Sequence, residues 1–186
     1  PSSFDDLQKA RRRLVFEEFF VFSAGLAAIR TQREALHTKA MDTQHMEPFY
    51  RLLPFRLTNA QQVAIDDILR DLSACRPMNR LVQGDVGSGK TMVAAAACFC
   101  AIQNGHQAAF MAPTEILAEQ HAQSLSRLFS PLGIHVTLLT GSMTAAQKRA
   151  AKSAITSGTA QLIIGTHALF TRELQFHDLA LVVCDE

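Results

Sequence analysis

The chain has 186 residues, of which 48% are hydrophobic and 19% charged, and its formal net charge is +1. This length suits one domain with a real core plus an accessory element, and the composition excludes a chain that is disordered throughout. Because the charge balance lacks a strong basic excess, any prediction of nucleic-acid binding must rest on motifs.

Residues 4–33 predict one long helix, because apolar residues recur there at close to helical spacing. Residues 11–29 superficially resemble a signal peptide with a basic start. Glu17 and Glu18 interrupt an apolar stretch that is already too short to span a membrane. We therefore expect a buried amphipathic helix and no membrane partner.

Residues 37–54 have a looser pattern with two prolines, which is typical of a linker. The sequence thus predicts an N-terminal helical segment and linker over residues 1–54 and a second unit over residues 55–186. In that unit helices alternate with short apolar strands. The predicted helices cover residues 58–72, 90–103, 114–129 and 144–156, and the predicted strands cover residues 80–83, 108–111, 134–139, 161–164 and 180–184. Helical or longer crossovers between strands predict a parallel α/β sheet.

A glycine-rich stretch between a predicted strand and a predicted helix fits the pattern G-x-x-x-x-G-K-[ST]. Its residues are Gly84, Asp85, Val86, Gly87, Ser88, Gly89, Lys90 and Thr91. Glycines let backbone N–H groups wrap a phosphate, and the following helix adds its positive dipole end. Lys90 supplies a charge for the β and γ phosphates, and the Thr91 hydroxyl is a candidate Mg²⁺ ligand. We expect a P-loop nucleotide site.

The last predicted strand delivers Asp185 and Glu186 at its carboxyl end, where ligands of α/β sheets bind. Beside a P-loop, this pair is typical of a Walker B element. We expect Asp185 to hold Mg²⁺, and Glu186 to orient or deprotonate the attacking water. Lys90, Asp185 and Glu186 are the candidate catalytic residues.

The four cysteines, Cys75, Cys98, Cys100 and Cys184, lack the spacing of zinc ligands. We expect all four to be reduced core residues of a cytoplasmic protein.

Six segments, LPFRLTNAQ, RLVQGDVGSGKT, MAPTEILAEQH, LLTGS, IIGTHALF and LVVCDE, occur in the order and spacing of superfamily-2 helicase motifs. Their sequences resemble those of the RecG-type DNA helicases, which act in branch migration and fork remodelling during recombination and repair. The resemblance implies a RecA-like P-loop domain, the first of two motor domains, that uses ATP and Mg²⁺. It also implies three partners: branched DNA such as forks and Holliday junctions, a second RecA-like domain, and a wedge domain.

Further site residues are implied by the resemblance alone. Gln61 matches the glutamine that reads adenine, with Phe55 as a flat surface for the base. The positions that track the DNA backbone are matched by Pro113, Thr114, Gly141, Ser142, Thr166 and His167. Thr114 and Ser142 are also good helix N-caps, and both roles stay open. For the basic triplet at residues 11–13, a DNA contact and a solvated helix face both stay open.

Because the second motor domain is not in this chain, we expect the chain alone to lack appreciable ATP hydrolysis. Other classes stay open as alternatives: the motor of a transcription-repair coupling factor, a replication-restart helicase, another P-loop enzyme such as a kinase or GTPase, and a non-catalytic nucleotide-gated module. A GTPase would need an Asn-Lys-x-Asp stretch to read guanine, and the sequence has none.

Overall fold

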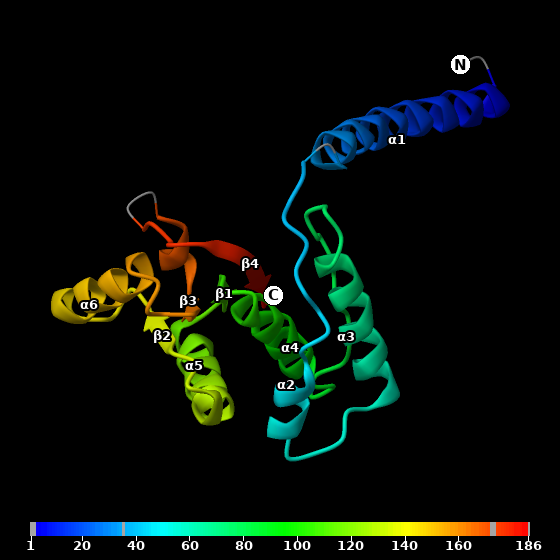
Figure 1. Ribbon diagram of the computed structural model, residues 1–186. Helices are drawn as coiled ribbons and strands as arrows, with labels where there is room; N and C mark the ends of the chain where they lie inside the picture. The colour runs from blue at the N-terminus through cyan, green and yellow to red at the C-terminus, as the bar shows by residue number, and fades with distance from the viewer. Residues whose placement is uncertain (1–2, 35, 172–173, 186) are drawn as a thin grey trace.

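The computed structural model describes residues 3–34, 36–171 and 174–185. Its centre is a four-stranded, all-parallel sheet in the order β2-β3-β1-β4 (Figure 1). The strands are β1 (Gln107–Met111), β2 (Val136–Leu139), β3 (Leu162–Gly165) and β4 (Leu179–Cys184). The helices are α1 (Phe4–Glu34), α2 (Glu47–Leu52), α3 (Asn59–Leu72), α4 (Lys90–Gln103), α5 (Glu115–Phe129), α6 (Ala145–Thr156) and the 3-10 turns η1 (Ser130–Leu132) and η2 (His167–Phe170). The predicted parallel α/β fold is confirmed.

Two helices begin at threonine caps with the same local chemistry. The Thr58 hydroxyl accepts a hydrogen bond from the Gln61 N–H at the start of α3, and Thr144 accepts one from the Gln147 N–H at the start of α6. Each glutamine side chain in turn accepts a bond from the backbone N–H of its cap. Such capping boxes satisfy backbone groups that would otherwise be unpaired, which is why the sequence predicts where these helices begin.

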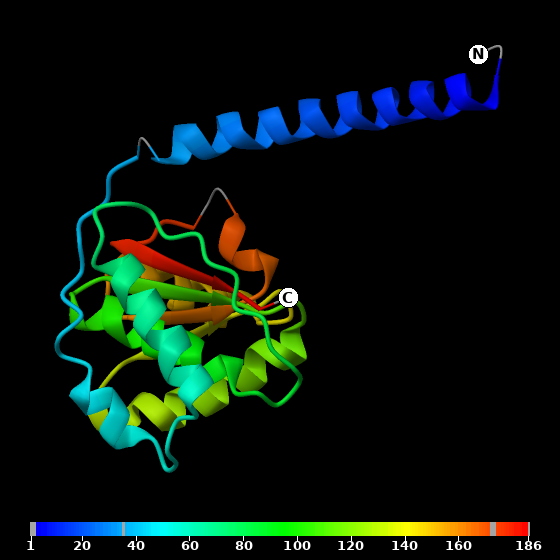
Figure 2. The ribbon, with the colours of Figure 1, turned by 90° about the vertical axis from the view of Figure 1, so that its right-hand side faces the viewer.

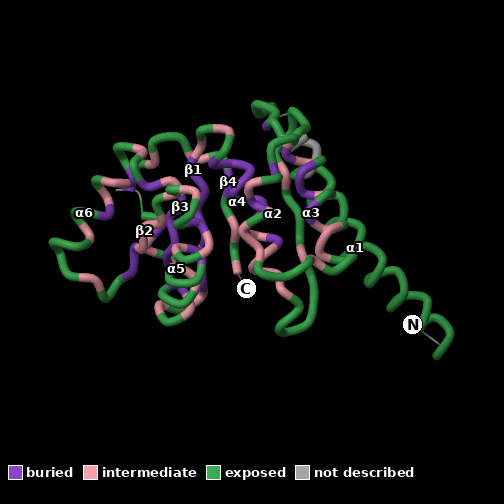
Figure 3. Tube along the Cα trace, turned by 60° about the horizontal axis from the view of Figure 1, so that its bottom comes forward, coloured by how far each residue is buried: buried purple, intermediate pink, exposed green. Residues whose placement is uncertain are grey.

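The core has two layers, one on each face of the sheet. On one face three phenylalanines from three helices pack together, Phe49 of α2, Phe99 of α4 and Phe129 of α5. Successive strand residues point to opposite faces, so Ile163 and Ile164 of β3 fall in different layers. The buried segments gather around the strands (Figure 3).

The expectation of a buried first helix is wrong. Helix α1 extends away from the rest of the chain (Figure 2), and its apolar side chains are exposed, with Phe16 and Phe19 each at 67%. Phe16 stacks on Phe20 of the same helix, with ring centroids 5.9 Å apart. The helical spacing of apolar residues predicted the helix itself correctly. Burial also requires a partner surface, and α1 lies outside both core layers. Among the described helices, none is long and apolar enough to cross a membrane.

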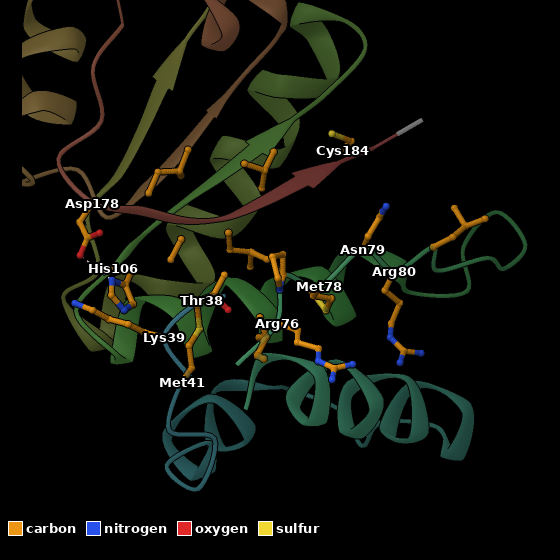
Figure 4. Close-up of a pocket in the computed structure, with 17 residues that line it drawn as sticks. Thr38, Lys39, Met41, Arg76, Met78, Asn79, Arg80, His106, Asp178 and Cys184 are labelled. Atoms are coloured by element: carbon orange, nitrogen blue, oxygen red, sulfur yellow. Dashed lines mark hydrogen bonds and ion pairs between the residues drawn. The ribbon is translucent and has the colours of Figure 1, made fainter. Parts of the chain in front are cut away.

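The predicted strand at residues 80–83 is also wrong, because this segment is not paired with the sheet. Arg80 instead donates to Asp71 of α3 at 2.6 Å and to Asp67 at 3.4 Å, and Figure 4 shows its side chain pointing toward that helix. The Asp71 hydrogen bond raises the pKa of Arg80 above its ordinary value, so the guanidinium stays charged. Leu81 is left 89% exposed.

A cavity of about 770 Å³ separates this segment from the open edge of β4 (Figure 4). It is larger than the cavity that the P-loop helix borders, but it contains none of the predicted site residues. Its walls are the edge of β4, the segment at residues 76–81 and the chain around Met41, Leu72 and His106. We attribute it to the open edge of β4 rather than to a ligand site.

The cysteines divide into two groups. Cys98 and Cys100 are buried in α4, as expected, whereas Cys75 and Cys184 are exposed, so the expectation of four core cysteines is wrong for these two. Burial raises the pKa of Cys98 to about 12 and that of Cys100 to about 11, so both remain thiols at neutral pH. Cys184 is exposed because it lies at the open edge of the sheet.

The predicted linker contains one short helix, α2, which the sequence did not predict. Its Phe49 is fully buried, and Met41 and Met46 join the same core layer. Part of this stretch therefore packs with the unit that follows it, and the division between residues 54 and 55 stays a prediction.

Candidate functional site

The glycine-rich loop runs directly into the first turn of α4 and is open to solvent. Gly87 and Gly89 have φ angles of 80° and 82°, a left-handed backbone that favours glycine, and Gly89 is the N-cap of α4. The Lys90 ammonium donates to the carbonyl oxygens of Gly84 at 2.7 Å and Asp85 at 3.0 Å. The lysine thus lies folded across the loop, beside the N-terminus of α4, and helix N-termini suit a bound anion.

Gln61 connects helix α3 to this loop. Its Oε1 accepts from the Thr58 N–H at 2.9 Å, and its Nε2 donates to the Ser88 carbonyl oxygen at 2.8 Å. A Cβ added to Gly89 would collide with Gln61 Nε2. Both this close contact and the left-handed backbone therefore require a glycine at position 89. Phe55 precedes α3 and is half exposed. The structure brings Gln61 to the loop, while its role toward adenine stays a prediction.

Lys90, Thr91 and Asp185 border one cavity of about 290 Å³ between α4 and β4. The Asp185 N–H donates to the Met111 carbonyl oxygen at 2.8 Å, which continues the pairing of β4 with β1 and fixes the backbone of the acid. The hydroxyl of Thr91 and the carboxylate of Asp185 are hard oxygen donors of the kind that Mg²⁺ prefers. Glu186 lies outside the described residues.

No group of three His, Cys, Asp or Glu side chains within residues 3–34, 36–171 and 174–185 could hold a metal by itself. At Mg²⁺ sites of nucleotide-binding proteins, one or two side chains share the ion with phosphate oxygens and water.

The residues predicted to follow the DNA backbone lie in three loops at the carboxyl ends of adjacent strands. Pro113 and Thr114 follow β1, Gly141 and Ser142 follow β2, and Thr166 and His167 follow β3. Parallel strands bring their carboxyl ends to one edge of the sheet, so the three loops share that edge. The structure groups these residues, and their contact with the DNA backbone stays a prediction.

The structure adds contacts that the sequence did not predict in two of these loops. Thr114 caps α5 by accepting from the Leu117 N–H, as expected, but Ser142 caps no helix, because Thr144 caps α6. The Ser142 N–H donates instead to the Glu115 carboxylate at 3.0 Å. Hydrogen bonds with Ser142 lower the pKa of Glu115 below its ordinary value. The first two loops are therefore joined through the start of α5.

Sequence reasoning also missed His121 of α5, whose ring hydrogen-bonds to Asp185. Its position seven residues after the helix cap places it on the face that points back to the sheet, but nothing in the sequence indicated its partner.

Residues 58–186 match the family model described as DEAD/DEAH box helicase. Among curated proteins, the chain is similar to the ATP-dependent DNA helicase RecG of Synechocystis sp., with 49% identity covering 100% of this chain and 23% of that protein. It is also similar to the ATP-dependent DNA helicase RecG of Haemophilus influenzae, with 48% identity covering 95% of this chain and 26% of that protein. The chain thus spans about a quarter of the length of these relatives.

Solved structures give a consistent result. A structure of RecG bound to a three-way DNA junction is 45% identical and has a TM-score of 0.86 over 100% of this chain and 26% of that chain. A hypothetical ATP-dependent RNA helicase from Sulfolobus tokodaii, 21% identical with a TM-score of 0.56 over 78% of this chain and 41% of that chain, shares the fold.

Proposed function

Because the chain belongs to the DEAD/DEAH box helicase family, we propose that it forms the ATP-binding part of the first motor domain of a RecG-type DNA helicase. In such an enzyme, ATP hydrolysis drives branch migration and remodelling of stalled forks and Holliday junctions. The observation that carries the proposal is the convergence of Lys90, Thr91 and Asp185 on one cavity at the carboxyl end of the sheet. The similarity to RecG on a three-way junction supports branched DNA as the substrate.

The proposed ligand is ATP with Mg²⁺. The loop from Gly84 to Thr91 wraps the phosphates, and Lys90 leaves the two carbonyl oxygens that it now contacts to reach them. Thr91 and Asp185 hold Mg²⁺, which when bound neutralises charge on the phosphates. Glu186 orients or deprotonates the attacking water.

We propose that Gln61 reads adenine while it keeps its present contacts. One N–H of its amide goes to Ser88, and the amide nitrogen carries a second N–H. Its oxygen accepts from Thr58 and has a second lone pair. The remaining donor and acceptor match the edge of adenine, and Phe55 offers a face for stacking.

The proposed DNA surface is the edge that carries Thr114, Ser142 and Thr166 with their loop neighbours. Hydroxyls and exposed loop amides bond phosphate oxygens without reading sequence. A second RecA-like domain would close the ATP site, a wedge domain would engage the branch point, and both would act on DNA in the cytoplasm. By itself the present chain is proposed to be inactive in hydrolysis.

The test is the ATPase rate of the full-length protein that carries this sequence, measured with no DNA, linear duplex and a three-way junction. We expect the junction to stimulate the rate most, and Glu186→Gln to abolish turnover while ATP binding persists. Equal stimulation by linear duplex would favour the motor of a transcription-repair coupling factor. Absence of stimulation by any DNA would reject the motor function, and tighter binding of GTP than of ATP would point to another P-loop class.

A further inference from the structure

His121 makes a direct hydrogen bond to the carboxylate of the nucleotide cavity. It lies in the second turn of α5, and its Nε2 is 2.8 Å from Asp185 Oδ2. The histidine side chain is 14% exposed and the aspartate side chain 32% exposed, so the contact is shielded but not closed off from the cavity. A surface pair of this kind would be worth little, whereas partial burial strengthens it.

The imidazole ring has little freedom to leave this position. The ring centroid of Phe110, a residue of β1 that is 1% exposed, lies 4.7 Å from that of His121. The Asp185 backbone is fixed independently through its N–H bond to Met111 of the same strand. Strand β1 and helix α5 therefore hold both the main chain and the side chain of this acid.

A carboxylate has two oxygens, and His121 takes only Oδ2. The other oxygen is left for a ligand in the cavity that Lys90 and Thr91 also border. We propose that His121 is a positioning residue that turns the Asp185 carboxylate toward the metal and nucleotide, an inference that rests on the proposed function of this site.

The same helix carries the link to the loops of the proposed DNA edge. Glu115, in the first turn of α5, accepts from the Ser142 N–H, and His121 reaches Asp185 from the second turn. A shift of α5 along its axis therefore changes both contacts together. His121 is the point at which α5 meets the nucleotide site.

The experiment compares three substitutions at His121 in the full-length protein. His121→Leu keeps apolar volume against Phe110 and removes the donor. His121→Gln places an amide N–H near the position of Nε2, whereas His121→Asn carries a shorter amide that falls short of Asp185. If His121→Leu fails to fold, the Gln and Asn variants decide the question, because both are polar and they differ only in reach.

The chain offers a matched control at the other end of the same two strands. His106 Nδ1 lies 2.8 Å from Asp178 Oδ2, and the His106 side chain is 18% exposed. His106→Leu removes a histidine–aspartate contact of equal length from a similarly buried histidine, next to the amino ends of β1 and β4, but its partner Asp178 is 56% exposed. Because Asp178 is more exposed than Asp185, this variant should lower the melting temperature somewhat less than His121→Leu, and it does not touch the nucleotide site.

Three readouts separate positioning from a structural role: kcat and KM for ATP, Mn²⁺ affinity in the presence of ADP by EPR, and ADP affinity in EDTA. For His121→Leu and His121→Asn we expect kcat to fall and Mn²⁺ affinity to weaken, each by roughly 10- to 100-fold, as is usual when a residue that orients a metal ligand is lost. ADP affinity in EDTA should stay unchanged. His121→Gln should recover most of both losses.

Normal kcat and Mn²⁺ affinity in folded His121→Leu or His121→Asn would overturn the proposal. Equal losses in His106→Leu would also overturn it, because the effect would then be general. Both results leave the proposed function standing. If the unmodified protein itself neither binds ADP nor hydrolyses ATP, the proposed function is wrong, and the role of His121 is rejected with it.

Discussion

Gln61 and Gln147 form the same capping box at two helices, but only Gln61 also touches the phosphate loop. Gln61→Ala and Gln147→Ala should therefore lower the free energy of unfolding by similar amounts, about 0.5–1 kcal/mol. Only Gln61→Ala should weaken ATP binding, by about tenfold, since it removes hydrogen bonds worth about 1.5 kcal/mol. Denaturant titration and fluorescent ATP-analogue titration measure the two effects.

The ratio of GTP to ATP dissociation constants tests whether Gln61 reads the base. This ratio should fall toward 1 in Gln61→Ala and stay at the wild-type value in Gln147→Ala. If both variants weaken ATP binding equally, the cause is a loss of helix stability. The proposal that Gln61 reads adenine would then be rejected.

Lys90 and Lys148 offer a second comparison, because each ammonium donates to a carbonyl oxygen in a loop next to its helix. Lys90→Ala should weaken ATP binding by roughly 10- to 100-fold, because hydrogen bonds to charged groups contribute about 1.5–3 kcal/mol. Lys148→Ala, in α6, should leave ATP binding within about twofold of the wild type. Isothermal titration calorimetry with ATP and Mg²⁺ measures the dissociation constant of each variant. Equal ATP affinity of Lys90→Ala and the wild type would contradict the assignment of the phosphate loop.

At the level of elements, Gln107 at the start of β1 connects the end of α6 with the segments that lead into β3 and β4. This 3% exposed side chain donates to the carbonyl oxygens of Ile155 and Ala160 and accepts from the N–H groups of His177 and Asp178. Gln107→Leu leaves the carbonyl oxygens of Ile155 and Ala160 buried without their partner, so we expect a loss of about 3 kcal/mol in the free energy of unfolding.

Chemical denaturation measures that loss, and Gln103→Leu is its control, since Gln103 is an exposed residue of α4. The control should change the stability by less than about 0.5 kcal/mol. A loss of that small size for Gln107→Leu would mean that water replaces the amide without cost.

The elements differ in how far the sequence could predict them. Helices α3 to α6 follow from caps and spacing, which are local, and the P-loop follows from a motif whose context is also local. The segment at residues 80–83 has the composition of a strand, yet pairing depends on distant contacts, and its Arg80 bonds to α3. His121 was missed for the same reason, because its partner lies 64 residues away.

At the scale of the whole molecule, α1 presents an apolar surface that nothing in the described part of the chain covers. Its exposed large residues are Phe4, Leu7, Leu14, Val15, Phe16, Phe19, Phe20, Val21, Phe22, Leu26 and Ile29. Exposed apolar surface of this extent favours association. We expect the isolated 186-residue chain to self-associate through α1 as its concentration rises.

Sedimentation velocity over a range of concentrations measures this association. The double variant Phe16→Ser/Phe20→Ser should weaken it by at least about a hundredfold, because each buried phenylalanine contributes roughly 1.5–3 kcal/mol. A double variant at isolated exposed positions, Val63→Ser/Ile116→Ser, should leave association unchanged. If the wild-type chain stays monomeric at every concentration, the apolar surface of α1 does not mediate self-association. It must then be covered by a surface other than a second copy of α1.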